Sequence, residues 1–178
     1  LSHFFGKFNL DLQLDNFQTS NLSARLERVS SDKYLKLFED HITNEKNIRP
    51  SNFDTLTSTI QLSLNNDSYS FESGMTAYET LSGNSSDKYQ YILPYYNFDK
   101  TISKNYLNGS LNFSSSGSND LNSTNNLDTN IINQLNYDSQ EYFSDRGIKT
   151  NFKINLKNTN VMGKKSSKYK SSPQSELI

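Results

Sequence analysis

The segment Lys88–Asp99, KYQYILPYYNFD, decides the fold class of this chain. Its large apolar side chains are Tyr89, Tyr91, Ile92, Leu93, Tyr95, Tyr96 and Phe98. Aromatic and β-branched residues favour the pleated, half-buried surface of a strand. Pro94 cannot donate to a strand ladder, so it predicts an edge, a bulge or a strand end at that point. A strand so rich in rings is typical of a sandwich rim or of the aromatic girdle of a membrane barrel.

Composition excludes several classes of protein. The net charge of the 178 residues is −1, so we expect no basic surface for nucleic acid. The chain has no cysteine, which excludes disulfides and thiolate metal sites, and no apolar run approaches the roughly 20 residues of a membrane helix. Hydrophobic residues make up only 33%, but their regular alternation indicates a sheet with one wet face rather than disorder.

Alternating apolar and polar residues predict strands along the whole chain. The expected strands are 8–14, 22–29, 56–64, 68–81, 88–99, 106–115, 127–137 and 148–157, and the final residues SSPQSELI resemble the start of another. Asn65–Asp67 predicts a tight turn, and Gly74 predicts a bulge or bend. The segment 116–126 is expected to be a long polar loop. The spacing of Leu35 and Phe38 indicates a turn, and no convincing helix is expected.

The segment 148–157 has the clearest alternation of all. If it crosses a membrane as a barrel strand, one set of side chains faces lipid and the other faces the lumen. The predicted lipid-facing residues are Ile148, Phe152, Ile154 and Leu156, and the predicted lumen-facing residues are Lys149, Asn151, Lys153, Asn155 and Lys157. The lysine row is either an ordinary solvated face or a lumen surface that meets anionic groups.

Strand length and link length favour a membrane barrel over a soluble sandwich. The expected strands have about 8–14 residues, whereas soluble strands have about 5–6 and membrane strands about 9–11. The links after odd-numbered strands are short and most of the others are longer, which is typical of outer-membrane barrels. The sequence therefore predicts an all-β, antiparallel up-and-down meander that forms a partial wall of a large outer-membrane β-barrel. Because residue 1 is leucine and the last strand is unfinished, we interpret residues 1–178 as a fragment from which any signal peptide is absent or removed.

The sequence predicts no catalytic, cofactor or metal site. His3 and His41 have no partner at metal-ligand spacing, and the chain contains none of the common nucleophile, zinc-protease or phosphate-loop motifs. The Asx-rich segment Gly117–Asn126 lacks the ligand spacing of a calcium loop. We therefore expect a protein that is not an enzyme.

Three segments, taken in order, resemble one family. RLERVSSDKYLKLFED at 25–40 is similar to the strand and "SD..YL..F" signature of the LptD family of lipopolysaccharide-assembly proteins, whose barrel is also called the OstA C-terminal domain. TAYETL at 76–81 with KYQYILPYYNF at 88–98 resembles that family's "Y..L … Y..LP" segment. YFSDRGIKTNFKINLKN at 142–158 resembles a later strand of the family, most closely in alphaproteobacterial members.

The resemblance implies a function in the bacterial cell outer membrane. Members of the family receive lipopolysaccharide from a periplasmic bridge and insert it into the outer leaflet. The implied partners are lipopolysaccharide, membrane lipids and an LptE-like plug lipoprotein inside the barrel. This piece corresponds to the early-to-middle barrel wall, without the N-terminal jellyroll and the closing strands. The cysteines of better-known members are missing here, which leaves disulfide control of maturation open.

Two other functions are compatible with the same residues. One is another outer-membrane barrel, such as a porin or a receptor, and the other is a soluble extracellular β-sandwich or adhesin. The sequence upstream separates them, because a jellyroll domain indicates the assembly protein, a plug domain indicates a receptor and repeated modules indicate an adhesin.

Overall fold

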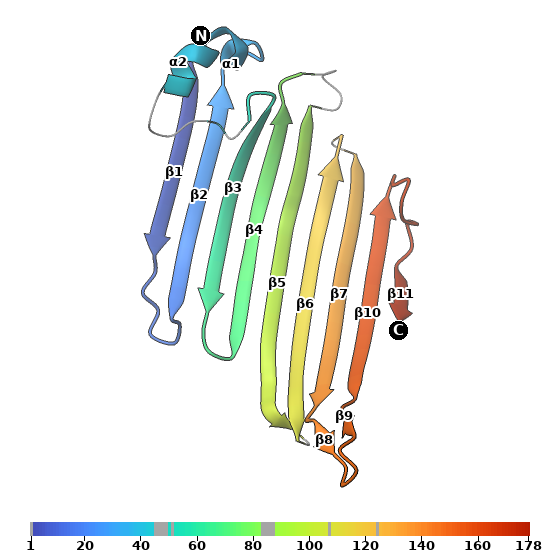
Figure 1. Ribbon diagram of the computed structural model, residues 1–178. Helices are drawn as coiled ribbons and strands as arrows, with labels where there is room; N and C mark the ends of the chain where they lie inside the picture. Colours follow the sequence, from blue (N-terminus) through green and yellow to red (C-terminus); the bar gives the residue numbers. More distant parts are fainter. Residues whose placement is uncertain (1, 45–49, 51, 83–87, 107, 124) are drawn as a thin grey trace.

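A computed structural model describes residues 2–44, 50, 52–82, 88–106, 108–123 and 125–178. The main sheet is an antiparallel meander of nine strands in the order β1-β2-β3-β4-β5-β6-β7-β10-β11 (Figure 1). The elements are β1 His3–Asp11, β2 Thr19–Val29, α1 Tyr34–Leu37, α2 Glu39–Asn44, β3 Thr55–Asn65, β4 Tyr69–Thr80, β5 Tyr89–Tyr106, β6 Gly109–Asn122, β7 Asn126–Ser139, β8 Tyr142–Phe143, β9 Lys149–Thr150, β10 Lys153–Lys164 and β11 Gln174–Leu177. The predicted all-β meander is confirmed. In the described part of the chain the sheet is not closed into a barrel, and β1 and β11 are its edges.

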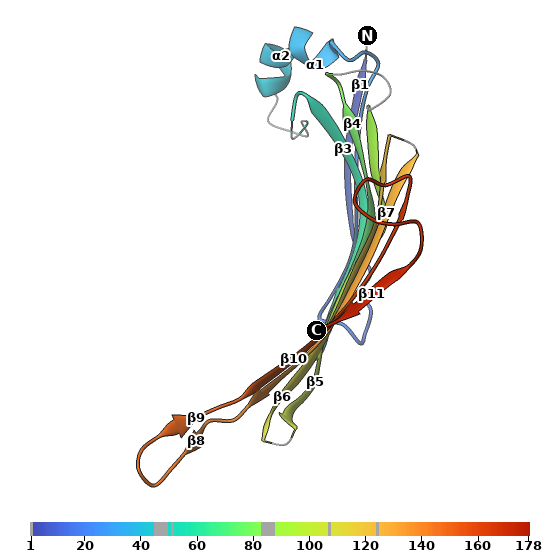
Figure 2. The same ribbon diagram turned by 90° about the vertical axis from the view of Figure 1, so that its right-hand side faces the viewer.

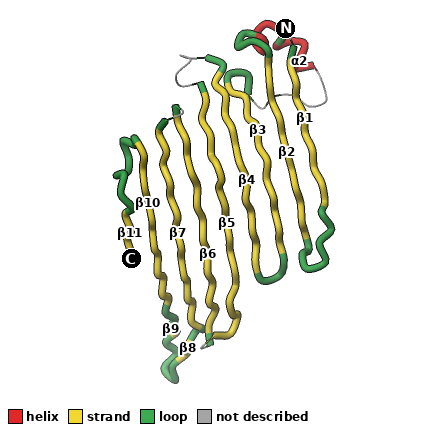
Figure 3. Tube along the Cα trace, turned by 180° about the vertical axis from the view of Figure 1, so that it is seen from behind, coloured by secondary structure: helices red, strands yellow, loops and turns green. Residues whose placement is uncertain are grey.

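The sheet is a curved, single-layered wall. Figure 2 shows that it bends along its strands, with α1 and α2 on the concave side. We call the end of the sheet that carries these helices the helix end, and the opposite end, where β8 and β9 lie, the hairpin end. Seen from behind, the strand ends step toward the hairpin end from β1 to β10 (Figure 3).

The predicted aromatic strand is confirmed and becomes β5, which is 18 residues long. Its register with β4 shifts between Gly74 and Thr76, and its register with β6 shifts around Pro94, so both residues mark irregularities as expected. A Cβ at Gly74 would lie 2.5 Å from the carbonyl oxygen of Ile60 and 2.8 Å from Oη of Tyr95. Glycine is required there because the Tyr95 ring packs directly over the backbone of β4.

The prediction of a long loop at 116–126 is wrong. Residues 116–122 continue β6, where Ser116 pairs with Asn97 on β5 and with Ile132 on β7. β7 then begins at Asn126. Serine and asparagine have low strand propensity, but a segment between two neighbouring strands satisfies its backbone groups on both sides, and this tertiary pairing overrides local preference.

The predicted strand 148–157 is wrong at both ends. β10 starts at Lys153 and continues to Lys164, while Lys149–Thr150 form β9, which pairs only with β8. A hairpin causes the break. The N–H of Ser144 donates to the carbonyl of Ile148 (2.9 Å), and Gly147 adopts a positive φ of 76° that suits glycine in a tight turn.

The expectation that the chain has no helix is also wrong. Two short helices, α1 and α2, occupy part of the β2–β3 link and close a small core at the helix end. The buried apolar residues of this core are Tyr34, Leu35, Ile42, Leu56 and Leu81, with Phe5, Val29 and Phe53 packed against them. Helices this short are marginal on their own, so their stability comes from this packing.

Two smaller expectations need correction. β1 covers His3–Asp11 rather than 8–14, because the N–H of Leu12 already donates to the carbonyl of Ser20 and the chain is turning there. The alternation of short and long links holds only for the first half of the chain. The β6–β7 connection at the helix end is tight, and the β7–β10 link at the hairpin end contains β8 and β9. The turn after β3 and the strand near the C-terminus are confirmed.

Candidate functional site

One face of the sheet is lined by apolar side chains that no described residue covers. The register places Phe8 opposite Ala24, Ala24 opposite Ile60 and Ile60 opposite Met75. Across the sheet, Leu135 pairs with Leu156 in the same way. The large side chains of this face that stay more than a third exposed include Phe4, Phe8, Leu10, Leu26, Ile60, Met75, Ile154, Leu156 and Met162. Apolar surfaces of this extent are typical of sites that contact a membrane or another molecule.

The accessible surface of the whole chain supports this interpretation. It is 12,242 Å² for a mass of 20.4 kDa. A compact soluble monomer of that mass exposes about 8,800 Å² by the usual scaling of surface with mass. The excess reflects a single-layered sheet in which the buried apolar cluster of the described residues lies at the helix end.

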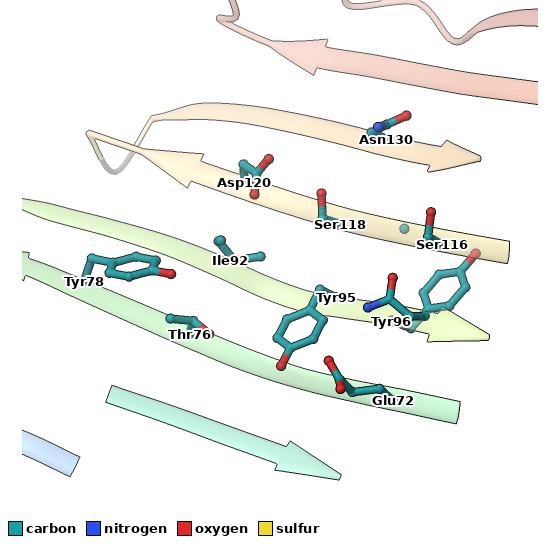
Figure 4. Close-up of a pocket in the computed structure, with 12 residues that line it drawn as sticks. Glu72, Thr76, Tyr78, Ile92, Tyr95, Tyr96, Ser116, Ser118, Asp120 and Asn130 are labelled. Carbon is teal, nitrogen blue, oxygen red and sulfur yellow. The ribbon is translucent and has the colours of Figure 1, made fainter. Parts of the chain in front are cut away.

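The opposite face is polar and concave. The helices pack on Phe5 and Val29, whose side chains alternate with the apolar set, so the concave side shown in Figure 2 is the polar one. A hollow of about 570 Å³ lies on this face over β4–β7, and the side chains that line it include Glu72, Tyr95, Asn97, Ser118, Asp120 and Asn130 (Figure 4). The sheet thus separates an apolar convex face from a polar concave face.

The predicted alternation holds within β10. Lys153, Asn155 and Lys157 pair with Asp138, Asn136 and Gln134 and lie on the concave face with them. Ile154 and Leu156 pair with Tyr137 and Leu135 on the convex face. The other predicted site residues, Ile148, Lys149, Asn151 and Phe152, lie before β10. Phe152 still packs beside the convex face, because its ring centroid is 5.6 Å from that of Tyr137.

Acidic neighbours partly neutralise the predicted lysine row. Lys149 forms an ion pair with Glu141 at 2.5 Å, and Lys153 forms one with Asp138 at 2.8 Å. The amide of Asn155 donates to Oδ1 of Asn136. Pairs this exposed contribute about 0–1 kcal/mol each. The geometry is that of a solvated polar face, and contact with anionic groups stays a prediction.

The concave face also contains an acidic pair that the sequence did not reveal. Asp120 lies directly opposite Asp128 on neighbouring strands, an arrangement that destabilises a sheet. Oδ1 of Asp128 and Oδ1 of Asn130 are buried and have no hydrogen-bond partner in the described structure. Even so, the described residues contain no group of three or more His, Asp or Glu side chains placed to hold a metal ion. His3 lies in β1, where its Nδ1 is 2.7 Å from the hydroxyl of Tyr34, and His41 lies in α2.

An ion-pair cluster ties the helix-end links together. Nζ of Lys88 lies 2.7 Å from Asp32 and 2.9 Å from Glu79. Hydrogen bonds to Asp32 and then to Glu79 raise the pKa of the Lys88 ammonium, so this group stays protonated at physiological pH. The cluster joins three segments: the residues before α1, the end of β4 and the residue before β5.

Sequence reasoning missed a row of polar side chains within the apolar convex face. Ser115, Asn133 and Asn158 occupy neighbouring positions on β6, β7 and β10. Each of these residues lies two positions after an apolar residue on the same face. In the sequence of a single strand, each therefore appears only as an interruption of the apolar alternation. Their alignment becomes visible only when the register of all three strands is known.

Comparison of the chain with protein-family models, with curated proteins and with solved structures found no match. The resemblance to the LptD family therefore stays a prediction based on the three quoted segments. Among the described residues, no helix is both long enough and apolar enough to span a membrane.

Proposed function

We propose that this chain forms part of the wall of an outer-membrane β-barrel that inserts lipopolysaccharide into the outer leaflet of the bacterial envelope. The observation that carries the proposal is the exposed apolar convex face opposite a polar concave face. An outer-membrane barrel needs this arrangement, with apolar residues toward lipid and polar residues toward the lumen.

Strand length supports the same proposal. A barrel strand crosses the hydrocarbon with about 9–11 residues. The seven strands β2–β7 and β10 have between 11 and 18 residues each. Because lipid offers no hydrogen bonds to a sheet edge, the free edges of β1 and β11 would have to pair with further strands. We propose that the sheet is a segment of a larger closed barrel.

The concave face would line the lumen of that barrel. Its neutral and mixed-charge side chains suit a water-filled interior that holds an LptE-like plug lipoprotein and passes the polar part of lipopolysaccharide. The family resemblance supplies the lipid substrate, the plug and the absence of an enzymatic reaction. A porin or a receptor has the same two-faced wall, so the choice among barrels depends on the resemblance.

Depletion of this protein from the cell is expected to reduce lipopolysaccharide at the surface. If the barrel inserts lipopolysaccharide, loss of the barrel prevents the lipid from reaching the outer leaflet. The outer membrane then becomes permeable to large hydrophobic antibiotics. Surface labelling of lipopolysaccharide before and after depletion measures the effect, with an unrelated porin depleted in parallel as the control. Unchanged surface lipopolysaccharide would contradict the assigned transport function, while leaving a barrel of another kind possible.

The isolated chain is expected to associate rather than to form a closed monomer. Strands at the two edges of an open sheet present unpaired backbone groups, and the free edge of β1 spans His3–Asp11. In detergent or lipid we expect oligomers without the heat-modifiable gel mobility of a closed barrel. Cross-linking and sedimentation measure this. A heat-modifiable monomer would show that these strands close by themselves.

A further inference from the structure

Four lysines lie close together where β10 ends and the link to β11 begins. Residues 164–170, KKSSKYK, contain Lys164, Lys165, Lys168 and Lys170, and all four are exposed. The whole chain has a net charge of −1, so this local concentration of positive charge does not follow from its composition. We call residues 164–170 the basic link. It lies at the helix end, beside the edge of the sheet (Figure 1).

Backbone hydrogen bonds hold the basic link in a compact turn. The N–H of Gly163 donates to the carbonyl of Lys170 (2.8 Å) and closes the turn. Inside it, Oγ of Ser166 accepts from the N–H groups of Lys168 and Tyr169 at 2.9 and 3.0 Å. The lysines are therefore presented by a defined turn rather than spread along an extended segment.

The turn borders a hollow with a basic and hydroxyl-rich lining. The hollow has a volume of about 710 Å³, and the side chains that line it include Lys165, Lys168, Lys170, Ser166, Ser167 and Ser171. The described residues that line it include no aspartate and no glutamate. Lysine ammonium and serine hydroxyl groups both donate hydrogen bonds, and phosphate oxygens accept from both. The lining therefore suits a phosphate group.

The four lysines are not neutralised by carboxylates. Among the described residues, none of the four forms an ion pair, whereas Lys149 and Lys153 are each paired with an acidic side chain. Nζ of Lys168 lies 4.9 Å from the centroid of the Tyr169 ring, which is a cation–π contact rather than a charge pair. Like charges this close repel one another, so a bound anion would stabilise the basic link.

The basic link adjoins the apolar convex face. One row of the register on that face runs through Tyr91, Leu121, Leu127 and Lys164. The link also covers the concave side of the end of β10, because a Cβ at Gly163 would lie 2.5 Å from Cβ of Ser166. The lysines therefore lie at the rim of the wall, where an apolar row of the convex face ends.

We propose that the basic link binds the phosphate groups of anionic lipid headgroups at the rim of the wall. The inference rests on the proposed membrane location and adds a binding site to it. An amphiphile fits this place because its acyl chains cover the apolar row while its phosphate oxygens accept from the lysines and serines. A phosphate compound without an apolar part would leave the row uncovered.

A binding titration tests the site. The complete protein is purified in an uncharged detergent with a fluorophore at Ser172→Cys, which lies beside the basic link, and the chain contains no other cysteine. Short-chain phosphatidylglycerol, phosphatidylcholine and inorganic phosphate are titrated separately. We expect phosphatidylglycerol to bind more tightly than phosphatidylcholine by at least about 25-fold, and the preference should fall as salt is added.

Substitution of the lysines assigns the effect to the link. One lysine near an anionic surface changes affinity by about fivefold, so Lys165→Gln with Lys168→Gln should weaken phosphatidylglycerol binding by about 25-fold. Exposed, unpaired lysines contribute little to stability, so this variant should fold normally. Lys165→Arg with Lys168→Arg keeps both charges and should preserve binding. The matched control, Lys149→Gln with Lys153→Gln, removes the same charge elsewhere and should also preserve it.

The outcomes separate the inference from the proposed function. Equal affinity for the two lipids, or equal losses from the two pairs of glutamine substitutions, would overturn the assignment. Inorganic phosphate that binds as tightly as phosphatidylglycerol would show an anion site without a lipid preference, which also overturns it. If the link binds phosphatidylglycerol as expected but depletion leaves surface lipopolysaccharide unchanged, the transport function is wrong and the lipid site stands.

Discussion

Ile154→Arg is expected to impair assembly of the sheet in a membrane. Ile154 lies on the convex face of β10 and is 50% exposed. A cationic residue on the lipid face costs about 2–4 kcal/mol at the bilayer midplane and close to zero near the interfaces. Net stabilities are only about 5–15 kcal/mol, so this is a large share. The measurement is the fraction of variant protein that resists extraction from membranes by urea.

Lys153→Gln is the matched control for this prediction. It removes a charge from the neighbouring residue on the concave face, where the ion pair with Asp138 is largely exposed. Such a pair contributes about 0–1 kcal/mol, so assembly should be nearly normal. Equal impairment by the two substitutions would contradict the assignment of the two faces.

Substitution alone does not separate a membrane wall from a soluble sandwich, because both bury Ile154. Single cysteines do separate them. In a membrane, the thiol of Ile154→Cys should resist a water-soluble maleimide and be quenched by a lipid-borne spin label, and the thiol of Lys153→Cys should behave in the opposite way. If both positions react equally with the water-soluble reagent, β10 does not cross a membrane.

Leu35→Ala is expected to release α1 and α2 from the concave face. Leu35 is fully buried and packs in the cluster that includes Ile42 and Leu56. Truncation of a buried leucine to alanine costs about 2–5 kcal/mol, because it loses apolar burial and leaves a cavity. Helices of four and six residues have little stability of their own, so local loss of structure should follow. Limited proteolysis of the β2–β3 link measures the release.

Leu37→Ala provides the control within the same helix. Leu37 is 66% exposed, and exposed substitutions usually change stability by no more than about 0.5 kcal/mol. The proteolysis rate should therefore stay close to that of the unmodified chain. If Leu37→Ala accelerates proteolysis as much as Leu35→Ala, the helices are not held by the cluster described here.

The sequence by itself determined the secondary structure class and the two-faced character of most strands. Alternation within β3 and β10 was sufficient to assign Ile60 and Ile154 to an apolar face and Lys153 to a polar one. The turn after β3, the irregularity at Gly74 and the break at Pro94 also followed from local chemistry. These features depend on the conformations of a few consecutive residues, and those conformations follow from the residue types in the sequence.

Predictions based on local residue preferences were wrong where contacts with neighbouring strands determined the structure. Residues 116–122 are strongly polar, yet strands on both sides hold them in β6. The alternation of 148–157 continues from β9, the second strand of the β8–β9 hairpin, into β10, although the two strands belong to different sheets. The helices exist because Leu35 and Ile42 find apolar partners on the sheet, some of them on strands distant in sequence. In each case the deciding contacts involve residues that a short window of sequence does not contain.

Only the tertiary structure decided the row of Ser115, Asn133 and Asn158 and the packing of Tyr95 over Gly74. Both depend on register, the alignment of each strand with the next. A shift of one residue in register would move every side chain of a strand to the other face. Alternation fixes the two faces of a strand but not its position along its neighbour, because that position depends on backbone pairing and packing across the whole sheet. Ser115, Asn133 and Asn158 form a continuous row only because two separate registers, β6 with β7 and β7 with β10, bring them together.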